Sequence, residues 1–259
     1  MQQIELFVGC SPNGEDAESQ MVLEYTAKKN SSLPVNIHWM KHSDNSDSFW
    51  HGWKSGSWAT PFSGFRWGIP EFCGFEGQAI YMDSDMIVLG DLAELWNIPW
   101  NDNAIVMGKG GWRFCVSKWN CARAAAVLPK VKIIRTTPHA HRELVRQLPK
   151  HPQLQQTIDR QWNNFDGETD NIEDIKVLHY TNMSTQMHLK YAIPRLQAKG
   201  RSHWFDGTLS QHPRKDIVEL FDTLYHEAID AGYHVTQYET ERWIPYEKAS
   251  QKNYRPPEN

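Results

Sequence analysis

The chain opens with an alternation of strand and helix signals that limits the folds it can adopt. A β-rich apolar run, IELFVGC (4–10), stops at the turn residues Ser11-Pro12-Asn13-Gly14. Residues 15–30 then have a helical pattern, with acidic residues at the start, two lysines in the last turn and Asn30 as a C-cap. A second strand follows over 35–41. This order is that of a βαβ unit, so the sequence predicts an α/β fold with a parallel sheet.

Further elements are expected along the chain. The segment 43–64 is rich in Ser, Asp, Gly and Trp and predicts a loop, and 121–165 has a mostly helical pattern with breaks at three prolines. Strands are expected over 79–83, directly after Asp85, and over 103–109, 113–120 and 174–181.

Residues 213–233 have the pattern of an amphipathic helix. Its apolar residues form one stripe, and Gly232 follows as a stop; the stripe comprises Ile217, Leu220, Phe221, Leu224 and Ala228. We therefore expect a main domain over residues 1–200 and a helical extension over 201–259 that packs on it.

Charge and composition exclude several classes of protein. Lys and Arg number 27 against 31 Asp and Glu, for a net charge of −4, which argues against a nucleic-acid partner. No window approaches the ~20 apolar residues of a membrane span, and no signal peptide is evident. The 4 cysteines form no C-x-x-C pair, as expected of reduced thiols. We expect a cytoplasmic protein, with peripheral membrane association as an alternative.

Two carboxylates interrupt the apolar run AIYMDSDMIVLGDL (79–92). Alternate residues of a strand point the same way, so Asp83 and Asp85 are expected to converge at the carboxyl end of a strand, where ligands gather in open α/β sheets. Burying two unpaired carboxylates is costly, and a divalent cation removes that cost. The pattern indicates a metal–phosphate site; the alternative is an ordinary Asp-Ser-Asp turn.

The longer stretch YMDSDMIVLGDLAELW resembles the D-x-D segment of GT-A glycosyltransferases, in particular glycosyltransferase family 8, whose pattern is Y-L-D-x-D-x-(I/V)-V-x-x-D-(L/I)-x-x-L. Three more segments match in the same order: FVGCSPN (7–13), TPFSGFRWGIP (60–70), which carries Arg66, and VLHYTNMSTQMH (177–188), which carries His179. The resemblance implies a GT-A fold, a Rossmann-like mixed sheet flanked by helices, with a C-terminal helical extension.

The resemblance also implies a set of site residues. The metal, Mn²⁺ or Mg²⁺, would be held by Asp83, Asp85 and His179. The turn within FVGCSPN (7–13) would bind the nucleotide, and Arg66 would hold the diphosphate or sugar. The residues expected to bind the nucleotide sugar are Val8, Gly9, Cys10, Ser11, Asn13, Arg66, Ser84, Asn182, Thr185, Gln186 and Lys190.

The chain departs from the family after His179. Where the family has H-x-x-G-x-x-K-P-W, this sequence has Asn182 at the Gly position, Thr185 at the Lys position and Gln186-Met187 at the Pro-Trp position. Lys190 or Arg195 could supply the missing charge.

The sequence leaves two alternatives for the group that deprotonates the acceptor. In an inverting enzyme a carboxylate of the stretch 157–170, Asp166 or Glu168 among them, would deprotonate the acceptor. In a retaining enzyme the leaving diphosphate could take that part.

The function expected is transfer of a sugar from a nucleoside-diphosphate sugar, most simply a UDP-sugar, to a hydroxyl of a glycan or glycolipid in bacterial surface polysaccharide synthesis. The alternatives are a sugar-nucleotide nucleotidyltransferase and a carbohydrate-binding protein without catalysis. The 12 tryptophans, clustered at Trp50, Trp53, Trp58 and Trp67, fit either core packing or a sugar-stacking acceptor loop. Donor sugar, stereochemistry and oligomeric state are not determined by the sequence.

Overall fold

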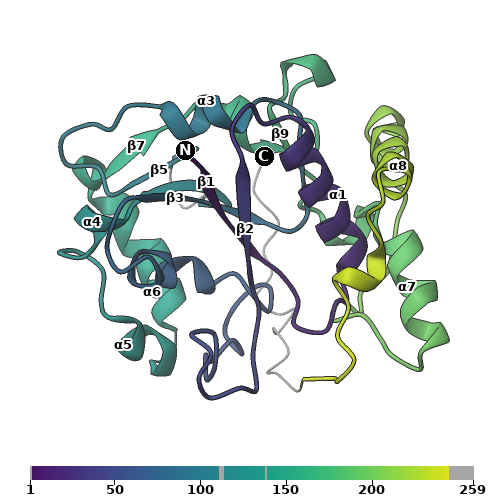
Figure 1. The fold of residues 1–259 in the computed structure, drawn as a ribbon, viewed down its shortest axis with the longest axis horizontal. Coiled ribbons are helices and arrows are strands. Elements are labelled where there is room, and N and C mark those ends of the chain that lie inside the picture. The colour runs from purple at the N-terminus through teal and green to yellow at the C-terminus, as the bar shows by residue number, and fades with distance from the viewer. Residues whose placement is uncertain (1, 111–113, 138, 245–259) are drawn as a thin grey trace.

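The expected βαβ unit begins the central sheet (Figure 1). The computed structural model describes residues 2–110, 114–137 and 139–244. Strand β1 (Ile4–Gly9) pairs in parallel with β2 (Val35–Met40), and helix α1 (Ala17–Lys29) connects them. The N–H of Asn30 donates to the carbonyl of Thr26, so α1 ends at its expected C-cap.

The sheet has six strands in the order β2-β1-β3-β6-β5-β7. Strand β3 lies parallel to β1 and β6 runs antiparallel to both β3 and β5, so the sheet is mixed, as expected. The remaining strands of this sheet are β3 (Gln78–Asp83), β5 (Val106–Gly108), β6 (Val116–Asn120) and β7 (Gln155–Thr157).

The segment 121–165 is only partly helical. It contains α4 (Cys121–Ala124), α5 (Val131–Thr136) and α6 (Ala140–Gln147), and also two strands that the pattern missed, β7 and β8 (Asn164–Phe165). Strand β7 is Gln-Gln-Thr at the end of the sheet order, so its place depends on pairing with β5 and not on an apolar period. The expected break at Pro138 lies outside the described residues.

A second, three-stranded sheet has the order β4-β9-β8. Strand β4 (Met86–Val88) pairs antiparallel with β9 (Val177–His179), which places His179 opposite Met86. The chain therefore changes sheets between β3 and β4, within the residues that carry the two aspartates.

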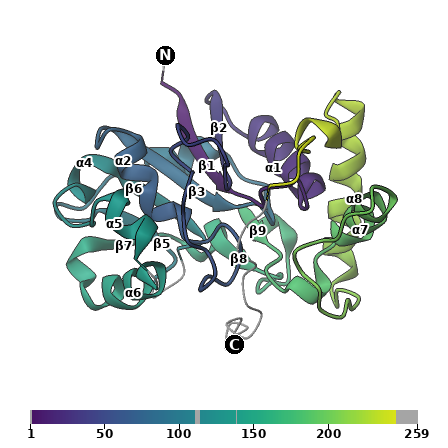
Figure 2. The same ribbon diagram turned by 90° about the horizontal axis from the view of Figure 1, so that it is seen from below.

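Helices flank the central sheet on both sides (Figures 1 and 2). One side carries α4, α5 and α6 together with α2 (Ile69–Phe72), and the other carries α1, α7 (Leu189–Ala198) and α8 (Lys215–Asp230); α3 (Leu92–Asn97) follows β4. The stripe expected over 213–233 is confirmed, because four of its five residues are buried and Leu220 is half-buried. Within the described ranges, we find no helix with both the length and the apolar character needed to cross a bilayer.

The tryptophan cluster is core packing. Trp50, Trp53, Trp58 and Trp67 are each less than 9% exposed. The first three surround Phe65, and Trp67 packs against Phe114 and Trp119. Because their rings are buried against other aromatic side chains, they offer no platform on which a sugar could stack. The loop 43–64 is thus ordered by its aromatic side chains.

Gly64 is expected to be the least replaceable residue of this cluster. A Cβ there would lie 2.3 Å from the Trp58 ring, whereas one at Gly68 would lie 3.1 Å from its nearest ring atoms, and both residues have φ −85°. We predict that Gly64→Ala lowers the free energy of unfolding by about 2 kcal/mol or more, as measured by urea denaturation. Gly68→Ala is the matched control, and an equal loss in both variants would contradict this account.

Candidate functional site

Asp83 and Asp85 converge on His179, but not along one strand. Asp83 is the last residue of β3, and Asp85 lies in the bend before β4. The expectation that strand alternation aligns them is therefore wrong, because the strand ends between them. Even so, His179 Nε2 lies 3.2 Å from Asp85 Oδ1 and 4.0 Å from Asp83 Oδ2.

Arg66 is bound to Asp83. Its Nη2 donates to Asp83 Oδ1 over 3.0 Å, and the Tyr81 hydroxyl donates to the same oxygen. The guanidinium carbon lies 4.4 Å from the centre of the Tyr81 ring, and all three residues are buried. Burial lowers the pKa of Arg66, but its electrostatic interactions with Tyr81 and Asp83 outweigh burial and hold that pKa above its usual value. Arg66 therefore fixes one oxygen of Asp83 and leaves Oδ2 facing His179.

Asn163 orients the His179 ring. Its Oδ1 lies 3.2 Å from His179 Nδ1, so a proton on Nδ1 leaves the Nε2 lone pair pointing at the carboxylates. Burial lowers the pKa of His179, but the charge and contact of Asp85, with the charge of Asp83, outweigh it and raise that pKa. The site favours positive charge at Nε2, which a proton or a cation can supply.

The donor set fits a divalent cation. Asp85 Oδ1 is buried, and apart from the His179 ring 3.2 Å away it has no hydrogen-bond partner among the described residues. Two carboxylate oxygens and one imidazole nitrogen suit Mn²⁺ better than Mg²⁺.

Cys115 is a neighbour of this site that the sequence analysis missed. Ligand atoms of Asp83, Cys115 and His179 lie within 4.8 Å of one another. The signal lies in the pairing of strands, since Met82 faces Val116 across β3 and β6 and Cys115 precedes Val116. Burial raises the pKa of this thiol and keeps it protonated, which makes it a weaker ligand than the carboxylates.

Gln186 contacts the second oxygen of the Asp85 carboxylate. Its Nε2 donates to Asp85 Oδ2 over 2.7 Å. Beside Asp85, a cavity of only about 10 Å³ lies between Ser84, Gln186 and Trp204. That is room for about one water molecule.

The candidate bases occupy different places. Asp166 lies beside the site: its N–H donates to the His179 carbonyl over 2.9 Å, and its Oδ1 lies 3.7 Å from His212 Nε2. Burial raises the pKa of Asp166. Glu168 forms an ion pair with Lys109 and is exposed. Asp166 thus contacts a proposed metal ligand through its backbone.

The residues after His179 are mostly committed to local contacts. The side chain of Asn182 accepts from Ser184 N, and Thr185 Oγ1 donates to the Asn182 carbonyl. Lys190 forms an ion pair with Asp222 of α8. Arg195 binds Glu18 and Glu239, so neither basic residue considered as a replacement for the family's lysine is paired with the carboxylates of the site.

The loop after β1, residues 10–14, is buried under other parts of the chain. Val8, Cys10, Ser11 and Asn13 are at most 1% exposed, and Gly9 is also buried. Ser11 Oγ accepts from the N–H of Asp16, while the Asn13 side chain is hydrogen-bonded to the backbone of Ile244. Residues near the C-terminal end of the described chain therefore lie over the expected nucleotide loop.

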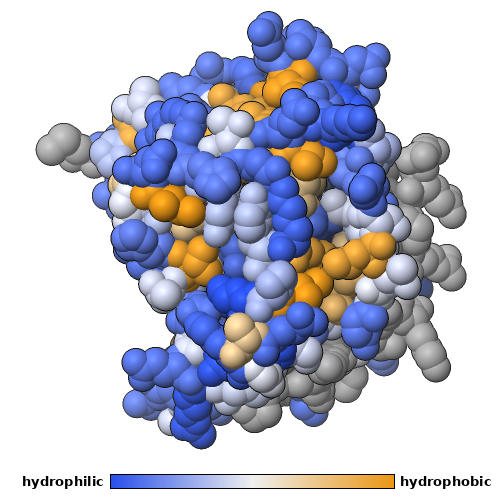
Figure 3. Space-filling model, turned by 90° about the vertical axis from the view of Figure 1, so that its right-hand side faces the viewer, coloured by the Kyte–Doolittle hydropathy of each residue, from blue (hydrophilic) through white to orange (hydrophobic). Residues whose placement is uncertain are grey.

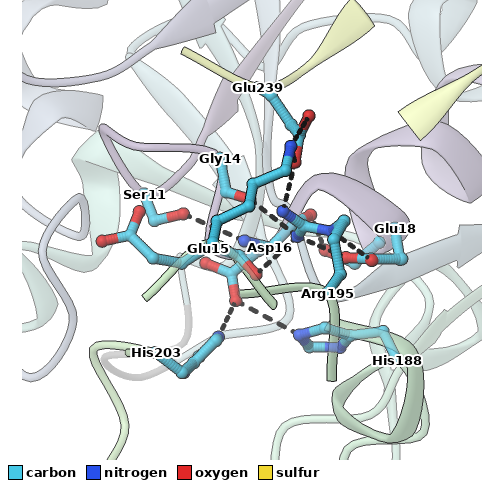
Figure 4. A network of polar contacts seen from close by, with 11 residues as sticks. Ser11, Gly14, Glu15, Asp16, Glu18, His188, Arg195, His203 and Glu239 are labelled. Atoms are coloured by element: carbon cyan, nitrogen blue, oxygen red, sulfur yellow. Dashed lines mark hydrogen bonds and ion pairs between the residues drawn. The ribbon is translucent and has the colours of Figure 1, made fainter. Parts of the chain in front are cut away.

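A second cluster, Asp16, His188 and His203, holds distant segments together (Figure 4). The N–H of Phe205 donates to His203 Nδ1, so the proton of that ring lies on Nε2 and donates to Asp16 Oδ1 over 2.7 Å. A metal ion would need a lone pair on Nε2 of His203, and that nitrogen carries the proton instead. We therefore interpret the cluster as a set of hydrogen bonds that holds these segments together, here called the clamp. Trp204 Nε1 also donates to Asp16, over 2.9 Å.

Asp16 carries the negative charge of this clamp. Burial raises the pKa of Asp16, but its electrostatic interaction with His203 and the hydrogen bonds from His188 and His203 outweigh it and hold that pKa well below its usual value. The carboxylate thus remains an acceptor for the segments that meet there.

Comparison with solved structures defines the fold. The chain resembles the apo form of the glycosyltransferase GlyE of Streptococcus pneumoniae with a TM-score of 0.54 and 12% identity, over 94% of this chain and 66% of that one. It resembles the galactosyltransferase LgtC, solved with donor and acceptor sugar analogs, with a TM-score of 0.52 and 11% identity, over 87% and 96% of the two chains. No protein-family model matches the chain, and no curated protein matches it in sequence.

These neighbours establish a GT-A-like glycosyltransferase fold. The chain spans just under two thirds of the GlyE chain. At 11–12% identity the likeness concerns the fold, so the activity has to be argued from the site.

Arg66 is expected to be essential for stability as well as for the site. We predict that Arg66→Met lowers the free energy of unfolding by about 3 kcal/mol, because it leaves Asp83 buried without its cation. Adding Asp83→Asn should recover part of this loss. Urea unfolding of both single variants and the double variant measures the coupling, and strictly additive losses would contradict a direct pairing.

Proposed function

We propose that this protein is a metal-dependent glycosyltransferase that uses a nucleoside-diphosphate sugar. The observation that carries the proposal is the convergence of Asp83, Asp85 and His179 at the carboxyl end of β3 in a GT-A-like fold. The carboxyl ends of parallel strands are where such sheets bind ligands. The orphaned Asp85 Oδ1 and the oriented Nε2 support a bound cation.

Asp83, Asp85 and His179 would hold the cation, Mn²⁺ in preference to Mg²⁺. When bound, it supplies Lewis-acid stabilisation of the charge that develops on the leaving diphosphate. Arg66 keeps Asp83 Oδ2 turned toward the cation, and Asn163 keeps the His179 lone pair available. Gln186, hydrogen-bonded to Asp85, limits the rotation of that carboxylate.

The donor is proposed to be a UDP-sugar, bound by the loop after β1 together with Ser84. Asp166 is the candidate to accept the proton of the acceptor hydroxyl, because it lies against His179 and its pKa is raised. Surface polysaccharide synthesis remains part of this proposal on the strength of the resemblance alone.

The acceptor is proposed to bind in a cavity of about 530 Å³ that adjoins the site through Gln186. This volume lies within the range of small-molecule sites. Its walls combine apolar side chains, Leu189 and Leu209 among them, with polar ones such as His212 and Lys215. The cavity involves α7 and α8, on the side of the molecule where Figure 3 shows apolar patches between hydrophilic residues.

The metal site is tested by replacing its ligands one at a time. We predict that Asp83→Ala, Asp85→Ala and His179→Ala each reduce Mn²⁺-dependent turnover of the best donor in a nucleotide-sugar panel by about 100-fold or more. Asp102, which is exposed and lies outside the candidate site, provides the matched control: Asp102→Ala should retain full rate. Thermal stabilisation by oligosaccharide alone, indifferent to metal and nucleotide, would instead support a carbohydrate-binding protein.

Filling the cavity should separate acceptor binding from donor chemistry. Leu209 is 45% exposed at its wall, and Ile229, 38% exposed, lies outside it. We predict that Leu209→Trp raises KM for the acceptor about tenfold and leaves donor hydrolysis unchanged, whereas Ile229→Trp changes neither. Steady-state kinetics with both substrates varied make the comparison. An unchanged acceptor KM in Leu209→Trp would place the acceptor elsewhere.

A further inference from the structure

The loop after β1 lies at the same sheet edge as the metal site. Gly9, the last residue of β1, pairs with Asp83 across β1 and β3. The following residues, Cys10 to Gly14, therefore extend from the edge that carries the carboxylates. If the diphosphate of a donor contacts the cation, the base of that donor can contact this loop.

The segment 238–244, here called the covering segment, lies directly on that loop. Gly14 has φ +69°, and a Cβ there would lie 2.8 Å from both Glu239 Cα and the Tyr238 carbonyl oxygen. Such a close backbone approach is possible only at a glycine. The packing is therefore tight, and no ligand fits between loop and segment in this arrangement.

Asn13 pairs with the covering segment as it would pair with a base. Its Oδ1 accepts from Ile244 N over 2.6 Å, and its Nδ2 donates to the Ile244 carbonyl over 3.1 Å. Nδ2 also lies 3.4 Å from Glu15 Oε1, and Asn13 N donates to Glu15 Oε2 over 2.8 Å. Because a carboxylate only accepts, Glu15 favours this orientation of the amide. Asn13 thus presents an acceptor beside a donor.

Arg201 fastens the covering segment. Its Nη1 donates to the Thr240 carbonyl over 3.1 Å and its Nη2 to the Glu241 carbonyl over 3.0 Å, and its guanidinium lies 5.7 Å from the centre of the Trp243 ring. Figure 4 shows a further attachment through Glu239, which accepts from Arg195 Nη1 over 2.7 Å. These contacts are polar and near the surface, so they can be exchanged for contacts with a ligand.

The described residues leave little open space between the loop and the metal site. The cavity between Asp16, Ser84, Asp85 and Trp204 measures about 10 Å³, and Asn13 is 1% exposed. For a nucleotide sugar to contact Asn13, part of the described cover has to move.

We propose that Ile244 occupies the place of the donor's base in the unliganded chain, and that a donor binds by displacing residues 239–244. Asn13 then hydrogen-bonds a base edge that carries an N–H donor beside an acceptor. This inference rests on the proposed function and adds to it a base contact and an autoinhibitory contact.

Loosening the covering segment should strengthen nucleotide binding. We expect Arg201→Ala to bind UDP with Mn²⁺ about fivefold more tightly than the parent chain, since fewer hydrogen bonds then have to be broken. Arg123→Ala is the matched control: Arg123 is half-buried like Arg201 and also donates to two backbone carbonyls, those of Asn101 and Ala104. Isothermal titration calorimetry gives the affinities. Equal affinity in Arg201→Ala and the parent chain would overturn the autoinhibitory contact.

The same contact predicts a structural readout that needs no nucleotide. Hydrogen exchange at residues 8–16 should accelerate in Arg201→Ala and not in Arg123→Ala. A second variant, truncated after Tyr238, should show the larger acceleration while Tyr238 keeps its hydrogen bond to Glu24. Unchanged exchange at the loop in both Arg201→Ala and the truncated variant would overturn the proposal.

The contact of Asn13 with the base is tested in the chain truncated after Tyr238, which lacks Ile244. With Mn²⁺, adding Asn13→Ala to this variant should weaken UDP binding about tenfold. Equal binding of UDP by the truncated chain with and without Asn13→Ala would overturn the base contact and leave the transferase proposal intact. If none of UDP, GDP, CDP and ADP binds the parent chain, Arg201→Ala or the truncated variant, both this inference and the donor class fail.

Discussion

The burial of Asp83 is the constraint on which the site depends. A carboxylate at the end of a buried strand is tolerated only where positive charge and hydrogen-bond donors surround it. Arg66 and Tyr81 satisfy one oxygen, and the other is left facing His179 and Asp85. Arg66 thus balances the charge of Asp83, and the charge of Asp85 is left for a cation or a proton to balance. That division explains why an arginine expected to bind diphosphate is bound to Asp83.

The change of sheet after β3 turns this constraint into a site. Because β3 ends at Asp83 and β4 belongs to another sheet, the backbone bends between them and Asp85 faces back toward His179. Strand β9 brings His179 to this bend by pairing with β4. Two of the proposed ligands, Asp83 and His179, therefore stand on two different sheets, and Asp85 lies in the short bend that joins β3 to β4. Such supports hold side chains more accurately than a free loop does.

The surroundings of the site are closed by residues far apart in the chain. Asp16 is hydrogen-bonded to His188, His203 and Trp204, and Asn13 is hydrogen-bonded to Ile244. These polar contacts cover the edge of the sheet where the donor is proposed to bind. Because these contacts are hydrogen bonds, they can be exchanged for others when the proposed donor displaces residues 239–244.

The sequence by itself determined the βαβ opening, most strands and the helix over 215–230, because apolar periods and turn residues are local signals. It also singled out Asp83, Asp85 and His179, which the fold brings together, while their role as metal ligands stays a prediction. It did not determine that Arg66 pairs with Asp83, or that Cys115 lies beside them. Nor could it show that Asp16 meets His203, 187 residues away, or that Asn13 meets Ile244, 231 residues away. Only the tertiary structure decided these contacts, because a hydrogen bond between distant segments leaves no period or spacing in either one.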